Sequence, residues 1–224
     1  MESMDFIYPL LSVISESLAK TMDKLNYQRN KVWPRQLLFL LFATMVAGTL
    51  ISTLFIHQAL PAVTWAVAAL VLFMICLSFG QNFFDYVGLH TKNLSLREPI
   101  SNFEPVLASF LAYILFPSER NVKYVVAIIA GTIILYLSNS NRKLRLEFDK
   151  GTVFFFLGVV CSAVLASVYK LGLENMSPSY LLLFRTTGVL VLLCLFFRPE
   201  VKSIRKSQTV LGVATGTLYV IGNL

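Results

Sequence analysis

The chain has 224 residues, of which 56% are hydrophobic and only 14% are charged. A soluble domain carries roughly 25% charged residues, and several apolar runs here approach or exceed the about 18 residues that indicate a transmembrane helix. The net charge of +7 lies in short loops between these runs, which fits an anionic membrane surface better than nucleic acid. The composition therefore predicts an all-α polytopic membrane protein without a nucleic-acid partner.

Apolar runs predict three helices in the first part of the chain, over residues 6–25, 33–55 and 61–89. The first run is the least apolar, because Ser12, Glu16 and Lys20 recur every four residues and share one face of a helix. Two interpretations of this polar face stay open. It packs inside a helical bundle, or it lines a cavity in which Glu16 binds a proton or a substrate.

The third run ends in the polar segment QNFFDYVGL. Asn82, Asp85 and Tyr86 are spaced i, i+3 and i+4, so they share one helix face. This pattern is typical of a helix end that enters the headgroup region with an interfacial tyrosine. It equally fits a polar patch that faces a cavity, and both interpretations stay open.

The fourth run carries a carboxylate directly before a proline, in LREPISNFEPVLASFLAYILFPSER. We expect a helix over residues 95–116, which places Glu104 near the middle of a membrane. Pro105 would then interrupt the backbone hydrogen bonds inside this helix and act as a hinge. An ionisable residue at this depth is by default a candidate functional residue.

The remaining apolar runs predict helices over residues 122–137, 152–171, 178–197 and from residue 209 onward. Arg185 is a cation inside the seventh of the predicted helices. It pairs with Glu104 to hold the bundle, or it takes part in binding. Gly212 and Gly216 of the eighth helix form a G-x-x-x-G pair, which favours close packing against a neighbouring helix.

The two halves of the chain repeat weakly. Overlaying Ser12–Leu25 on Gly158–Leu171 matches Lys24-Leu25 with Lys170-Leu171. After a two-residue gap, Pro34 falls on Pro178, and each proline opens the next helix. These matches predict a first repeat of five helices over residues 1–139, a basic linker over 140–150 and a truncated second repeat of helices 6–8 over 151–224. Five spans per repeat would insert the halves in opposite orientations, with a shared site near the membrane midplane.

Three segments carry a family resemblance. FEPVLASFLAYILFPSER holds the Glu104-Pro105 pair and a closing Glu119, AGTIILYLSN is centred on Gly131, and DKGTVFFFLGVVCSAVLASVYKLGLENMSPSYLLLFR ends with Arg185. With these segments the chain resembles the EamA family of the drug/metabolite transporter superfamily. Leu41 departs from the family pattern, because it stands where the first repeat would match Arg185.

The resemblance implies a helical bundle of two inverted five-helix repeats, with about eight of ten expected helices in this chain. It also implies secondary transport of an amino acid, nucleoside, sugar or drug-like metabolite by alternating access, with proton-coupled export as one mode. The alternative is a truncated fragment without transport activity, or a membrane assembly or lipid-flipping subunit. The candidate residues for substrate or proton binding are Glu16, Glu104, Arg185, Asn82, Asp85 and Tyr86, with Pro105 as the hinge.

The expected partners are a small-molecule substrate, a coupling proton and membrane lipids, and the oligomeric state stays open. We expect no enzyme activity, cofactor or metal, because no nucleophile–base pair, phosphate-binding glycine loop or metal-ligand spacing occurs. With alternating spans, thirteen Lys and Arg residues fall on one side, and only Arg120, Lys123 and Lys170 fall on the other. Because positive loops face the cytoplasm, the N-terminus is expected outside the plasma membrane.

Overall fold

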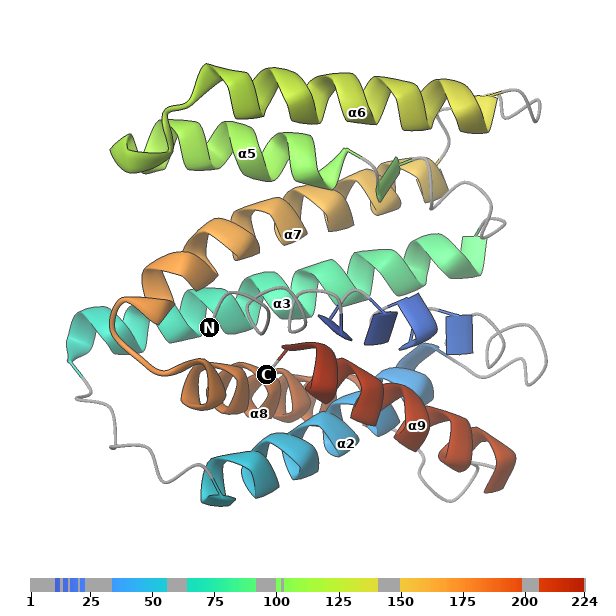
Figure 1. Ribbon diagram of the computed structural model, residues 1–224. Helices are drawn as coiled ribbons and strands as arrows, with labels where there is room; N and C mark the ends of the chain where they lie inside the picture. Colours follow the sequence, from blue (N-terminus) through green and yellow to red (C-terminus); the bar gives the residue numbers. More distant parts are fainter. Residues whose placement is uncertain are drawn as a thin grey trace. The chain divides into compact units, whose positions relative to one another are not determined.

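The structure is a computed structural model, and it describes residues 11–12, 14–15, 17–19, 21–22, 34–55, 64–91, 100–101, 103–140, 150–198 and 206–223 (Figure 1). Its labelled helices are α2 (Pro34–Phe55), α3 (Trp65–Thr91), α5 (Glu104–Leu115), the 3-10 helix η2 (Pro117–Glu119), α6 (Val122–Ser140), α7 (Lys150–Leu173), α8 (Pro178–Phe197) and α9 (Lys206–Asn223). The described residues between Leu11 and Met22 are also helical. In the described residues the predicted all-helical class is confirmed.

Four of these helices are long and apolar enough to cross a membrane. The apolar stretches are Gln36–Phe55, Trp65–Gly88, Lys150–Leu173 and Pro178–Phe197. Shorter apolar stretches occur in α5, α6 and α9. Several helices of membrane-spanning length, which the composition predicts, are therefore present.

The bounds of α8 agree with the predicted ones at both ends, and its two flanking residues explain why. Pro178 opens the helix, where a missing backbone N–H breaks no helical hydrogen bond. Arg198 ends it in the left-handed conformation, with a φ angle of 42°. A residue in this conformation cannot continue an α-helix, so the chain turns there.

α5 differs from the predicted fourth helix. It begins at Glu104, after Phe103 with φ −80° and ψ −15°, and Pro105 lies in its first turn. Ile100 and Ser101 are also helical, and Phe103 stands in a turn between them and α5. Pro105 has no N–H to donate to the carbonyl of Ser101, so a break just before Pro105 agrees with the predicted interruption of the helical hydrogen bonds. The role of Pro105 as a hinge stays a prediction. The 12 residues of α5 measure about 18 Å, which is less than a hydrocarbon core of about 30 Å.

The chain divides into two compact units. The first comprises Met1–Ile75 and Asn175–Leu224, and the second comprises Cys76–Glu174. α3 contributes its first half to the first unit and its second half to the second. Each unit thus combines helices from both predicted repeats, and the repeat boundaries at residues 139 and 151 stay a prediction.

In the first unit α2 packs against α8 and α9. Three close pairs join α2 and α9, each four residues further along both helices: Leu40–Gly212, Thr44–Gly216 and Gly48–Val220. A methyl group on Gly216 would lie 2.6 Å from Cβ of Thr44, so only glycine permits this approach. The predicted close packing of the G-x-x-x-G pair is confirmed, and the two helices run in the same direction.

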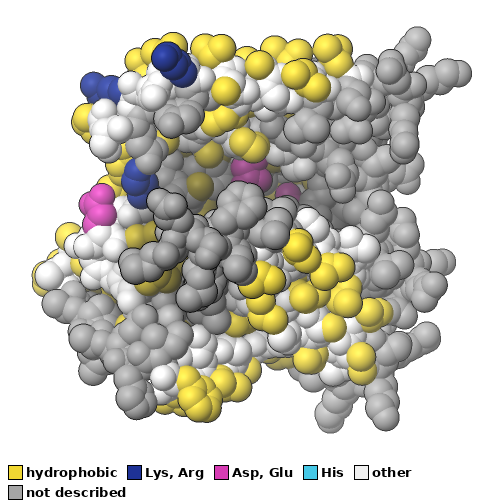
Figure 2. All heavy atoms as spheres, viewed as in Figure 1, with side chains coloured by type: hydrophobic (Ala, Val, Ile, Leu, Met, Phe, Trp, Pro, Cys, Tyr) yellow, Lys and Arg dark blue, Asp and Glu magenta, His cyan; other side chains and the backbone are white. Residues whose placement is uncertain are grey.

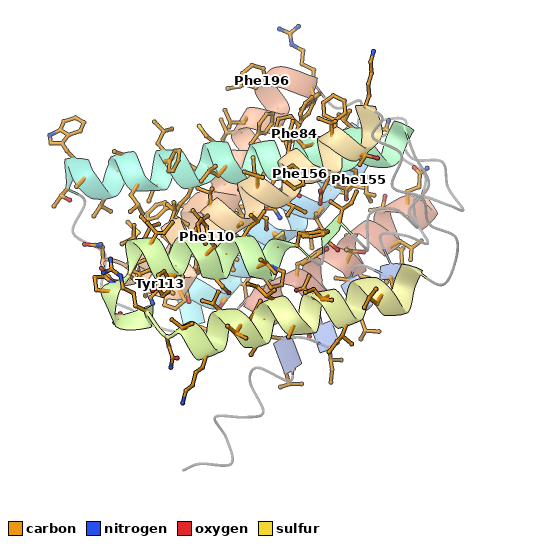
Figure 3. The ribbon with its side chains drawn as sticks, turned by 90° about the horizontal axis from the view of Figure 1, so that it is seen from above. Phe84, Phe110, Tyr113, Phe155, Phe156 and Phe196 are labelled. Carbon is orange, nitrogen blue, oxygen red and sulfur yellow. The ribbon has the colours of Figure 1, made fainter. Side chains whose placement is uncertain are left out.

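In the second unit the second half of α3 runs antiparallel to α7. The contact pairs descend along α7 as they ascend along α3: Gln81–Ser162, Asp85–Gly158 and Gly88–Phe155. Phe155, labelled in Figure 3, leaves no room for a side chain at Gly88, where a methyl group would lie 2.8 Å from its ring. α5 also packs on α7 and on α6. Its contacts Glu104–Ser162 and Phe116–Lys170 show that α5 and α7 run in the same direction.

These directions follow one rule. α2 and α9 are the second and eighth predicted helices, and α5 and α7 are the fourth and sixth, so the ordinal numbers in each parallel pair differ by an even number. The ordinal numbers of α3 and α7, the third and sixth, differ by an odd number, and these helices run antiparallel. A chain that crosses a layer back and forth produces this pattern.

Large apolar side chains lie on the surface of the helices as well as in the core, unlike in a soluble bundle. Large apolar residues are exposed along whole helices, as on α6 at Val122, Val126, Ile133 and Leu137. Figure 2 shows such hydrophobic side chains along the upper edge of the view, where α6 lies. By contrast, Thr49, Thr186 and Thr215 are 0% exposed, and each hydroxyl donates to a carbonyl of its own helix. Exposed apolar patches of this extent mark surfaces that are covered by another phase or partner.

Candidate functional site

A chain of hydrogen bonds in the second unit joins α3, α7 and α5. Nε2 of Gln81 donates to Oγ of Ser162 over 3.0 Å. Oγ of Ser162 donates to Oε1 of Glu104 over 2.5 Å. Ser162 is only 8% exposed, whereas Gln81 and Glu104 are half-buried. Glu104 is therefore held by a serine from a helix that lies 58 residues later in the chain.

Asp85 lies against α7 one turn away from this chain of hydrogen bonds. Gly158 precedes Ser162 by four residues, so both lie on one face of α7. A methyl group on Gly158 would lie 2.5 Å from Oδ1 of Asp85. The missing side chain of Gly158 thus makes room for the carboxylate. We refer to Gln81, Asp85, Glu104 and Ser162 as the Glu104 cluster.

The three polar residues of the third predicted helix have different surroundings. Asn82 donates from Nδ2 to the carbonyl of Ser78 over 2.7 Å, within its own helix. Tyr86 is only 7% exposed, and α3 continues beyond it to Thr91. The apolar stretch of α3 ends at Gly88, two residues after Tyr86, so both interpretations of Tyr86, interfacial or facing a cavity, stay open. Of the three, Asp85 joins the Glu104 cluster.

Glu16 and Arg185 are the remaining residues predicted to bind a substrate or proton. Glu16 lies outside the described residues. Arg185 belongs to the first unit, where it is half-buried in α8, eight residues from the proline that opens this helix. The structure shows a serine as a partner of Glu104, and the pairing of Glu104 with Arg185 stays a prediction.

The hydrogen-bond directions define the chemistry of the cluster. A serine hydroxyl has a single hydrogen, and Ser162 gives it to Glu104 while it accepts from Gln81. Glu104 is thus arranged as an acceptor, which is the role of an ionised carboxylate. Such a group can take up a proton or bind a donor group of a substrate. Among the described residues, no group of three or more His, Cys, Asp or Glu residues could hold a metal ion.

Ser162 and Gln81 belong to the site but were not predicted from the sequence. Gln81 stands next to Asn82 in the polar segment of the third predicted helix. Ser162 has a weaker signal: the overlay that places Ser12 on Gly158 also places Glu16 on Ser162. Polar residues at the same position of both predicted repeats were therefore the only sequence feature that pointed to Ser162 as a site residue.

No known protein family and no curated protein matches this sequence. Among solved structures, a crystal structure described only as that of a protein is similar, with a TM-score of 0.68. The similarity covers 96% of this chain and 78% of the other chain, with 18% sequence identity. At this identity the likeness concerns the fold alone.

Proposed function

We propose that this protein is a secondary transporter of the EamA type, in the drug/metabolite transporter superfamily. It moves a small metabolite, such as an amino acid, nucleoside, sugar or drug-like compound, across the plasma membrane by alternating access. The Glu104 cluster supplies a proton-binding or substrate-binding carboxylate. One observation carries this proposal, namely a set of helix contacts that recurs at equivalent positions of the two predicted repeats.

The first recurring contact involves the opening helix of each repeat. Ser12 donates from Oγ to the carbonyl oxygen of Gly222 in α9. Gly158 overlays on Ser12, and a methyl group on it would lie 3.5 Å from the carbonyl oxygen of Gln81 in α3. In both cases the opening helix of one repeat contacts a backbone carbonyl in the third helix of the other.

The second recurring contact involves the next helix of each repeat. Thr44 and Gly188 each lie ten residues after the proline that opens the helix. Thr44 is in contact with Gly216 of α9, and a methyl group on Gly188 would overlap the side chain of Ile75 in α3.

Both contacts lead to the same overlay of α3 on α9, in which Ile75 matches Gly216 and Gln81 matches Gly222. Gln81 follows Ile75 by six residues, just as Gly222 follows Gly216 by six residues. Two unrelated contacts that agree on a register support a duplicated architecture. Transporters built from repeats place their substrate site between the two copies, near the membrane midplane.

The position of Glu104 supports the same proposal. It stands in the first turn of a helix that begins afresh after Phe103. Discontinuous helices whose N-terminal ends face a cavity are typical of transporter binding sites. An ionisable residue inside a membrane is energetically costly, so such residues usually mark functional sites.

Proteoliposomes that contain the full chain test this proposal. Labelled amino acids, nucleosides and hexoses, and ethidium as a drug-like probe, are offered with and without an imposed pH gradient. We expect saturable uptake of at least one class, above that of protein-free liposomes. If a monodisperse, folded preparation moved none of them under either condition, the non-transporting alternatives would be favoured and the proposal would be refuted.

A further inference from the structure

We infer that Ser162 and Gln81 are positioning residues that hold the ionised carboxylate of Glu104 and keep the first turn of α5 closed, and that protonation of Glu104 opens this turn. The inference rests on the proposed function, in which Glu104 exchanges a proton or a substrate. It adds that protonation of Glu104 is coupled to a change in the structure of α5.

Few of the described polar contacts hold the start of α5, although the helix packs on α7 and α6. Phe103 provides no side-chain hydrogen bond to cap the helix, and none of the residues of α5 is fully buried. Ser109, one turn further on, bonds back to the carbonyl of Pro105 in its own helix. The hydrogen bond from Ser162 to Glu104 is a polar contact that ties the first turn of α5 to α7.

The opposite end of α5 is fixed in a way that does not depend on the same proton. Nζ of Lys170 lies 4.4 Å from the centre of the Phe116 ring, directly after α5. Arg120 donates from Nε to the carbonyl of Tyr113 and so caps the last turn. Cations of these types stay charged at acidic pH. The two ends of α5 should therefore respond differently to acid.

Gln81 makes the contact of Ser162 directional. Because the Gln81 amide donates to Oγ, the hydroxyl hydrogen of Ser162 is turned toward Glu104. A hydrogen bond to an ionised carboxylate is about twice as strong as one between neutral groups. Once Glu104 carries a proton, Ser162 can turn its hydrogen to a carbonyl one turn back in its own helix, as Ser167 does with Ala163. The bond to α5 is therefore strong while Glu104 is ionised and weak once Glu104 carries a proton.

Other titratable groups near the cluster come from each packed helix. From α3, Asp85 lies against Gly158. From α7, Cys161 is next to Ser162 in sequence and points toward Gly80 of α3, where a methyl group would lie 3.6 Å from its sulfur. On α5 and α6 the described groups Tyr113 and Lys123 belong to the opposite end of the pair. Asp85 is thus the group that has to be distinguished from Glu104.

Hydrogen exchange of the full chain in lipid nanodiscs, read by mass spectrometry, tests the inference. The amides from Leu107 to Phe110 report on the first hydrogen-bonded turn of α5, because N–H of Leu107 bonds to the carbonyl of Phe103. After correction for intrinsic rates, we expect their protection at pH 7 to exceed that at pH 3.5, where carboxyl groups are ordinarily protonated, about fivefold to tenfold. Amides near Phe116 serve as the internal reference and should not change.

Variants assign the effect to the named residues. Glu104→Gln and Ser162→Ala should each abolish the pH dependence, and Gln81→Leu should reduce it. Ser167→Ala, the same change on the same helix, and Asp85→Asn should both retain it. Unchanged pH dependence in Ser162→Ala or Glu104→Gln, or its loss in Asp85→Asn alone, would overturn the inference. Because exchange is measured without a substrate, a chain that lacks transport can still show the effect, and a transporter can lack it.

Discussion

Ser162 of α7 donates its hydroxyl hydrogen to the carboxylate of Glu104 in the first turn of α5. This bond joins two helices that run in the same direction, and Gln81 of α3 completes it from the other side. A carboxylate at the start of a short helix is thus fixed by residues from two longer helices. The proposed site is a meeting point of three helices.

The bond between Ser162 and Glu104 should contribute measurably to stability. Ser162→Ala leaves the half-buried carboxylate without this donor, and we expect a loss of about 1.5–3 kcal/mol, the range for a hydrogen bond to a charged group. The measurement is the thermal midpoint or the denaturant midpoint in detergent.

Ser167→Ala is the matched control for this change. The hydroxyl of Ser167 bonds to the carbonyl of Ala163 in its own helix, and alanine is the better helix former. We expect its midpoint to equal or exceed that of the wild type. Equal decreases of the midpoint in Ser162→Ala and Ser167→Ala would show that the contact of Ser162 with Glu104 does not contribute to stability.

The packing of α9 on α2 depends on the absence of a side chain at Gly216. Gly216→Ala would place a methyl group 2.6 Å from Cβ of Thr44 and 3.1 Å from the carbonyl oxygen of Leu41. We expect a loss of about 1–3 kcal/mol, as is typical of overpacking. Gly131 in α6 has nothing within 4 Å of such a methyl group, so Gly131→Ala should be neutral or stabilise by about 0.5–1 kcal/mol.

A second substitution separates this clash from a loss of helix flexibility. Thr44→Gly removes the atom that the new methyl group would meet. The double variant Thr44→Gly with Gly216→Ala should therefore be more stable than the sum of the two single changes predicts. Strict additivity of the three midpoints would contradict the contact.

The orientation of the chain is tested by cysteine labelling with a membrane-impermeant reagent. Lys123 stands at the start of α6, and Lys143 lies just beyond its end in the basic linker. The 19 residues of α6 measure about 28 Å along the helix axis. With the N-terminus outside, Lys123→Cys should react on intact cells and Lys143→Cys only after lysis, each relative to the signal of the native cysteines. The reverse pattern would show that the N-terminus is inside.

The sequence predicts helix bounds well where helix-starting or helix-ending residues are present, as with Pro178 before α8 and the charged residues after it. It predicts poorly which face of a helix packs against other helices, because helices that are apolar all round have no apolar stripe to distinguish a buried face from an exposed one. Small residues are the better signal in such helices, and Gly212 with Gly216 indicated the contact of α9 correctly.

The site illustrates the same limit. Glu104 and Asp85 stand out in the sequence as charges in or beside apolar runs. Ser162 does not, because a serine is unremarkable in such a helix, and its role arises from a contact between segments 58 residues apart. The start of α5 at Glu104 was also not predicted. A proline is found both at a break within a helix and in the first turn of a new one, so Pro105 alone does not fix where the helix starts.

The most direct test of the transport proposal is uptake into proteoliposomes as a function of pH. Wild type, Glu104→Gln and Ser167→Ala are compared with a substrate found in the panel of metabolites. We predict that uptake by the wild type and by Ser167→Ala varies with pH, and that this variation disappears in Glu104→Gln. The same pH dependence in Glu104→Gln as in the wild type would contradict the role of Glu104 as the proton-binding carboxylate.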